Sequence, residues 1–209
     1  MTSSVAAKSA AALGTVGAIG GGAALSKPYL FPSTPTLKSE IEKDGWTPLS
    51  SAHNTEITEV LNVYKTKTPT QFSSLTGNEG DAASKLLSEC KKLYERTIDD
   101  SGKEESLKKL KRWCVVPQTA KARLAHLKIT PLSTEAPASN RNESQEWVTK
   151  AKAYEGDQKD KFSGFTITSG DDNAKAKSLR GHCTSKLEVK STDESFDDTL
   201  NKLKLWCSK

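Results

Sequence analysis

The four cysteines of the chain form two pairs with identical spacing. Cys90 and Cys114 are 24 residues apart, and Cys183 and Cys207 are also 24 apart. A shift of 93 residues superimposes the pairs and further residues around them: Leu107 on Leu200, Leu110 on Leu203, Lys111 on Lys204, Trp113 on Trp206, Glu95 on Glu188, Gly77 on Gly170 and Phe72 on Phe165. Self-similarity in one register over more than forty residues predicts a tandem duplication.

Upstream of this register, a shift of 90 residues pairs Tyr64 with Tyr154 and Ile57 with Trp147. The repeat therefore predicts one unit over about 37–116 and a second over about 138–209. Prolines and small polar residues favour a linker over 117–137, in which "KARLAHLK" is compatible with a short helical turn. The proline-rich stretch 27–36 is expected to be a spacer.

Apolar residues at helical spacing predict about three helices in each unit. The clearest stripe contains Leu86, Cys90 and Leu93. The expected helices cover 54–65, 81–97 and 104–114 in the first unit, and in the second 143–156 and the counterparts of the other two. Short strands are expected at 165–169 ("FTITS") and 186–190 ("KLEVK"). The predicted fold is mainly α, with two small helical bundles in tandem behind an N-terminal membrane helix.

The cysteine spacing favours one disulfide within each unit. Gly102 and Ser195 lie at the midpoints of the two pairs, in polar stretches that predict helix–helix turns, so the cysteines of a pair face each other across two helices. Each bridge is expected to contribute roughly 3 to 4 kcal/mol. The neighbouring Trp113 and Trp206 are expected to pack over the bridges, and Leu110 and Leu203 belong to the apolar stripes that end in the second cysteines.

Two other uses of the cysteines stay open at this stage. Four free thiols would also fit the core of a protein kept in a reducing compartment. A zinc site is disfavoured, because the chain has no CxxC and has Glu89 where the second unit has His182.

The N-terminal stretch 1–26 is compositionally distinct from the remainder. It has one charge, Lys8, before an apolar run from Ser9 to Leu25, whose seventeen residues would span roughly 26 Å as a helix. The run predicts a signal peptide or an N-terminal membrane anchor, and a flexible soluble tail is the alternative. Gly17 and Gly21 fit the small-xxx-small pattern of packed membrane helices. We expect the body that follows to lie outside the membrane.

The sequence contains no motif of a known catalytic or cofactor site. HExxH, GxSxG, GxGxxG and Walker loops are absent from it, so we predict no catalytic residue, cofactor, metal or small-molecule substrate. The net charge of +5 comes from lysines interleaved with acids, which does not favour nucleic acid. His182 beside Cys183 permits a thiolate pair, but the first unit has no histidine at the equivalent position. "GDD" at 170–172 fits a polar loop or a helix start.

The anchor-like start "MTSSVAAKSAAALGTVGAIGGGAALS" and two lysine-rich units ending in "LKxWC" resemble the expanded paralogous protein families of haemotropic mycoplasmas. The resemblance implies a membrane-bound or surface-exposed protein with a role in host-cell contact or antigenic variation, and a host-cell surface or protein as partner. A secreted protein is the variant of this hypothesis. The alternative is an inner-face or intracellular binding module with free thiols and a basic surface that contacts anionic lipid or nucleic acid.

Overall fold

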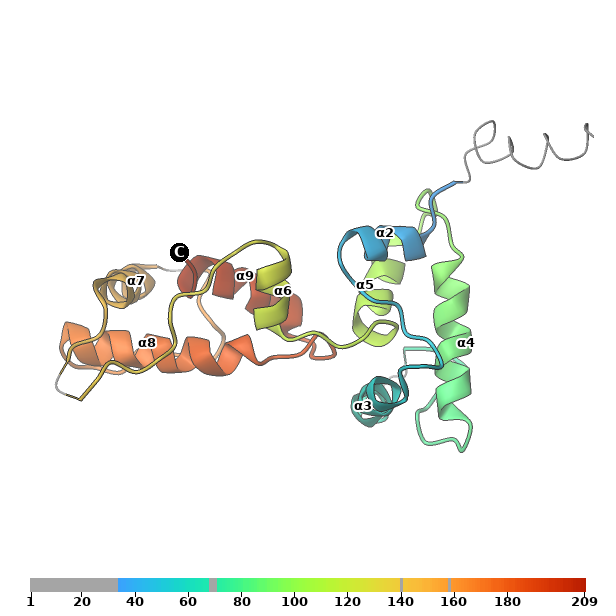
Figure 1. Cartoon of the computed structure of the whole chain (residues 1–209), viewed down its shortest axis with the longest axis horizontal. Coiled ribbons are helices and arrows are strands. Elements are labelled where there is room, and N and C mark those ends of the chain that lie inside the picture. The colour runs from blue at the N-terminus through green and yellow to red at the C-terminus, as the bar shows by residue number, and fades with distance from the viewer. Residues whose placement is uncertain (1–33, 68–70, 140, 158) are drawn as a thin grey trace, which may run out of the picture. The chain divides into compact units, whose positions relative to one another are not determined.

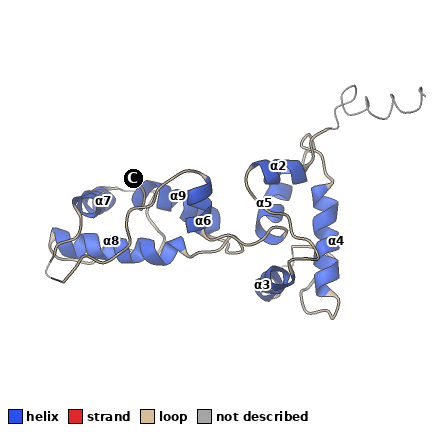
Figure 2. Cartoon of the chain, in the orientation of Figure 1, coloured by secondary structure: helices blue, strands red, loops and turns tan. Residues whose placement is uncertain are grey.

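The computed structural model describes residues 34–67, 71–139, 141–157 and 159–209. This part of the chain is mainly helical, as predicted: it contains eight helices and only isolated β-bridges (Figures 1 and 2). The predicted membrane segment, with Ser9, Gly17, Gly21 and Leu25, lies outside the described residues. None of the described helices is long and apolar enough to cross a membrane.

The helices fall into two sets of four, which we call the first and the second half. The first half contains α2 (Leu37–Lys43), α3 (Asn54–Tyr64), α4 (Ala82–Tyr94) and α5 (Lys103–Trp113). The second half contains α6 (Ala120–His126), α7 (Gln145–Gly156), α8 (Asp172–Leu187) and α9 (Phe196–Trp206). Both halves belong to one compact body, residues 36–209.

Side-chain caps fix the starts of several helices. The Thr36 hydroxyl accepts a hydrogen bond from the Ser39 amide at the start of α2, and the Thr119 hydroxyl accepts one from the Ala122 amide at the start of α6. The Asp171 carboxylate caps α8 in the same way, at the Ala174 amide. Such caps satisfy amide groups that have no partner within the helix. The "GDD" stretch is therefore a helix start.

The two halves share a set of backbone hydrogen bonds. In each, the first helix and the turn behind it are tied to the segment after the third helix and to the end of the fourth. The matching donor–acceptor pairs are Leu37–Arg96 and Ala120–Val189, Leu49–Cys114 and Leu132–Cys207, and Val116–Thr47 and Lys209–Thr130, at 2.8 to 3.1 Å. Hydrogen bonds between residues far apart in the sequence thus connect equivalent positions in both halves.

The stretch predicted as a linker, 117–137, differs from that prediction. It contains α6, which packs on α8 and α9. Leu124 and Leu132 are buried, at 0% and 3% exposure. Here a shift of 83 residues matches the halves, pairing Thr36 with Thr119. The prolines in this stretch lie outside the helix, in extended or irregular backbone, and Pro131 forms a β-bridge with Ser208. We count the second half from Thr119, the cap of α6.

The expected short strands are not found. Within the described residues, 165–169 makes no β-bridge, and 186–190 begins inside the last turn of α8. Only Lys190 forms an isolated bridge, with Thr119. The alternation of polar and apolar residues in these stretches instead places Ile167 and Leu187 in the core, at 9% and 4% exposure.

Candidate functional site

The cysteines form the two disulfides that the spacing favours. Cys90 of α4 is bonded to Cys114 at the end of α5, with a Cα–Cα distance of 5.3 Å. Cys183 of α8 is bonded to Cys207 at the end of α9, with a Cα–Cα distance of 5.8 Å. Both distances are in the usual range for disulfides. All four residues are buried, at 0 to 1% exposure, and the chain has no free cysteine.

The tryptophans before the second cysteines lie in the core. Trp113 and Trp206 are 1% and 5% exposed, and Leu110 and Leu203 are fully buried. The Trp113 ring meets Tyr64 edge-on at 5.0 Å between centroids, and the Trp206 ring meets Tyr154 at 5.1 Å. Such edge-to-face pairs add to the energy of burial alone.

Sequence reasoning missed the role of the two tyrosines. The Tyr64 hydroxyl accepts a hydrogen bond from the Phe72 amide at 2.7 Å, and the Tyr154 hydroxyl accepts one from the Phe162 amide at 3.0 Å. By these contacts the counterpart of Phe72 is Phe162, and not Phe165 as the shift of 93 suggests. The register of 90 residues, already visible in the two tyrosines, was the signal for this pairing.

His182 lies in an aromatic setting beside the second disulfide. Its ring stacks on Phe165 at 3.8 Å and meets Phe162 edge-on at 4.7 Å. Burial, with a smaller effect of the positive charge of Lys186, lowers the pKa of His182 to about 4. Because the sulfur of Cys183 is bonded to Cys207, the structure does not contain a thiolate next to this imidazole.

His182 should make the stability of the protein depend on pH. A pKa of about 4 in the folded state, against 6.5 when unfolded, means that the unfolded chain binds the proton more tightly. The stability that neutral His182 contributes to the folded state is fully present above pH 6.5. It is lost as the pH falls through 4. We expect His182→Gln to reduce this acid-induced loss by on the order of 1 kcal/mol. Thermal melts of both proteins at several pH values between 4 and 7 measure it, and parallel curves would contradict it.

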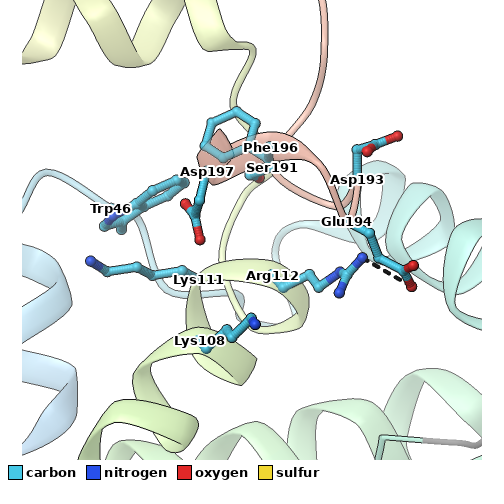
Figure 3. A pocket seen from close by; sticks show the side chains of 9 residues that line it. All are labelled: Trp46, Lys108, Lys111, Arg112, Ser191, Asp193, Glu194, Phe196 and Asp197. Atoms are coloured by element: carbon cyan, nitrogen blue, oxygen red, sulfur yellow. Dashed lines mark ion pairs between the residues drawn. The ribbon is translucent and has the colours of Figure 1, made fainter. Parts of the chain in front are cut away.

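The described residues offer no metal centre, because no group of three or more His, Cys, Asp or Glu side chains lies close enough to hold an ion. A small cavity lies where the two halves meet, between α5 and the segment before α9 (Figure 3). Lys108, Lys111 and Arg112 lie on one side of it and Asp193, Glu194 and Asp197 on the other. Its volume of about 20 Å³ is about that of one water molecule, too small for an organic ligand.

Polar contacts around this cavity connect the two halves. We call this region, with the pairs Arg123–Asp44 and Arg112–Glu194, the joint. Arg123 of α6 is 4% exposed and donates to the Asp44 carboxylate at 2.6 Å, and its guanidinium lies over the Trp46 ring at 4.5 Å. Burial opposes ionisation of Asp44, but Lys111 and Arg123 outweigh it and hold the pKa of this carboxyl below its usual value. Arg112 pairs with Glu194 at 3.3 Å.

Loss of the Arg123 contacts should loosen the joint. In an Arg123→Ala protein, Asp44 keeps Lys111 but loses its buried partner, and Trp46 loses the cation above it. We expect amide hydrogen exchange near Gln118 and Ser191, whose backbones pair beside the joint, to become about tenfold faster. Lys121→Ala, at an exposed position of the same helix, is the control. Unchanged exchange at both segments would show that Arg123 does not hold the joint.

No protein-family model, curated protein or solved structure matches the chain. The function is therefore argued from its own residues.

Proposed function

We propose that the chain is a non-enzymatic protein displayed on the outside of a cell membrane, where it contacts host cells or presents a variable antigen. The observation that supports this most is the oxidised state of all four cysteines, one buried disulfide in each half. Disulfides of this kind persist in extracellular compartments and are rare in a reducing cytosol. The apolar run 9–25 would supply the anchor, and a secreted form lacking it is the variant of the proposal.

We further infer that the halves arose by duplication of one disulfide-stapled helical unit. In support, α2–α5 and α6–α9 follow the same order, repeat the same backbone hydrogen bonds and carry their disulfides at the same separation of 24 residues. The duplicated unit would run from Thr36 to Val116 and from Thr119 to Lys209. A small unit of this kind gains much of its stability from a staple, because its core is thin.

Recognition by the outer surface fits the described residues better than chemistry in a pocket. The cavity at the joint is too small for an organic ligand, and two larger depressions are open to solvent on the surface of the first half. The resemblance to expanded paralogous protein families of haemotropic mycoplasmas is part of this proposal and suggests the host-facing role.

Surface labelling of intact cells tests the proposal. A membrane-impermeant amine-reactive biotin should label exposed lysines such as Lys91 and Lys177 on intact cells as fully as in lysed cells. A cytosolic protein of the same cells serves as the leakage control. Labelling that appears only after lysis would place the body inside the cell and overturn the proposal.

A further inference from the structure

The first half carries an open groove between α2, the turn behind it, and α4. The side chains that line it include the apolar Leu49, Leu87 and Tyr94, which we call its floor, together with Ser51 and the charged Lys38, Lys91 and Glu42. We call it the Leu87 groove; its volume is about 440 Å³. The Tyr94 hydroxyl donates to the Cys114 carbonyl and accepts from the Leu49 amide, so its polar atom is used internally.

The equivalent place in the second half is filled by the chain itself. Arg180 occupies the position of Leu87, three residues before the cysteine in both helices, and Thr134 occupies the position of Ser51. Arg180 donates from Nη1 to the Thr134 carbonyl at 3.0 Å and from Nε and Nη2 to the Glu143 carboxylate at 2.8 to 3.0 Å. Arg180 and Glu143 are 9% and 8% exposed.

A difference in length explains why only one groove is filled. The shift between the halves is 83 residues at Leu49 and Leu132 but 90 at Ile57 and Trp147, so the second half has seven more residues in this connection. These additional residues let the chain turn back, so that the Glu143 carboxylate reaches the Arg180 guanidinium. In the first half the chain passes directly from Ser51 into α3, and the groove is lined but not covered by the described residues.

We propose that the Leu87 groove binds a short segment of a partner protein that carries a large apolar side chain between acidic residues. The apolar side chain would take the place that Glu143 takes in the second half, because Leu87 replaces the arginine. Acidic neighbours are favoured by Lys38 and Lys91: they are 51% and 76% exposed, and their only ion pairs in the described residues are long ones, at 3.7 and 3.9 Å, to Glu42 and Glu95 of their own helices. Such surface pairs are weak and release their lysines readily.

This inference rests on the proposed function, because it names the surface by which the displayed body would meet a partner. Its test uses the purified, oxidised full chain and does not depend on where the protein lies in the cell. A phage-displayed library of random twelve-residue peptides is selected on the wild-type protein, after depletion on a Leu87→Arg protein. The selected sequence is then synthesised, and its affinity is measured by fluorescence polarisation.

We expect the selected peptides to share a large apolar residue with acidic neighbours. Leu87→Arg should weaken binding of the synthetic peptide about tenfold or more, because it places a charge where the apolar side chain docks. A Lys38→Glu/Lys91→Glu protein, which leaves the floor intact, should weaken it by about three- to tenfold and reduce its salt dependence. Lys177→Glu, on the exposed surface of α8, is the matched control and should bind as the wild type does.

Selection without a shared sequence, or equal affinity for the wild type and the charge-reversed protein, would overturn the proposal. Self-association that is abolished by Leu87→Arg, with no peptide selected, would do the same and would assign the groove to a second copy of the chain. Surface labelling of cells can succeed or fail whether or not the groove binds a peptide. Failure of the groove proposal can therefore be told apart from failure of the proposed surface location.

Discussion

Replacing Cys90 and Cys114 together by alanine is expected to lower the free energy of unfolding of the first half by about 3 kcal/mol. The bridge closes a loop of 24 residues between α4 and α5, and without it the unfolded chain gains the conformational freedom that the closed loop denies. Two alanines fit the same buried sites without a clash, and the volume of the two lost sulfur atoms adds a smaller cavity cost. For a half with a thin core, this loss is a large share of total stability.

Denaturant unfolding followed by tryptophan fluorescence measures the effect. The midpoint should move to a lower denaturant concentration, and the slope should rise because the unfolded state is less compact. The Cys183→Ala/Cys207→Ala protein is the matched comparison: with the same separation of 24 residues, it should lose a similar amount. A change below about 1 kcal/mol for both pairs would show that the staples do not stabilise the halves by loop closure.

Removing one partner of the buried ion pair between Arg180 and Glu143 should lower the free energy of unfolding by at least as much as loss of a disulfide. Glu143→Gln leaves the Arg180 guanidinium buried without its carboxylate, and such a loss costs about 3 to 5 kcal/mol. The hydrogen bond from Arg180 to the Thr134 carbonyl should weaken as well, because the Glu143 carboxylate no longer holds the guanidinium in place. Thermal melts and hydrogen exchange across 133–144 measure the two effects.

The double variant Arg180→Leu/Glu143→Leu separates the charge from the packing. It gives the second half the leucine that the first half has at this position, and apolar pairs of this kind often equal or exceed a buried ion pair in stability. We expect it to recover at least half of the stability lost in Glu143→Gln. A double variant as unstable as the single one would mean that the hydrogen-bond geometry of Arg180, rather than its unpaired charge, sets the cost.

The disulfides and the main helices were predictable because their signals are strong and local. Cys90 and Cys114 lie symmetrically about a polar turn, and the apolar stripes of α4 and α5 place them face to face. The same reasoning holds for α8 and α9. Periodicity and spacing are sufficient where long helices pack on neighbours that follow closely in the chain.

The remaining features depend on contacts that the local pattern does not show. Helix α6 has seven residues, too few for a clear period, and it is fixed by packing on α9, which begins seventy residues later. Arg180 and Glu143 are separated by 37 residues, and in the sequence Glu143 is one of many scattered acids. One signal was available: an arginine interrupts the apolar stripe of α8 at the position that Leu87 occupies in α4.

The change in register has a similar cause. Helix α8 has 16 residues and α4 has 13, so three additional residues shift the match from 90 to 93 within this helix. Phe72 and Phe162, which lie before these helices, follow the register of 90 residues, and the cysteines within them follow the register of 93. A single ungapped comparison cannot show both registers, and the matching contacts with Tyr64 and Tyr154 indicate which phenylalanines hold equivalent positions.

Peptide mapping of the cysteines in protein taken from its native cells tests the central claim most directly. Thiols are blocked at lysis, the protein is digested without reduction, and cross-linked peptides are identified by mass spectrometry. We predict peptides that join Cys90 to Cys114 and Cys183 to Cys207, with no blocked thiol on any of the four. Four blocked thiols would contradict the account, because the staples would then be absent in the cell and the oxidising surface location would lose its main support.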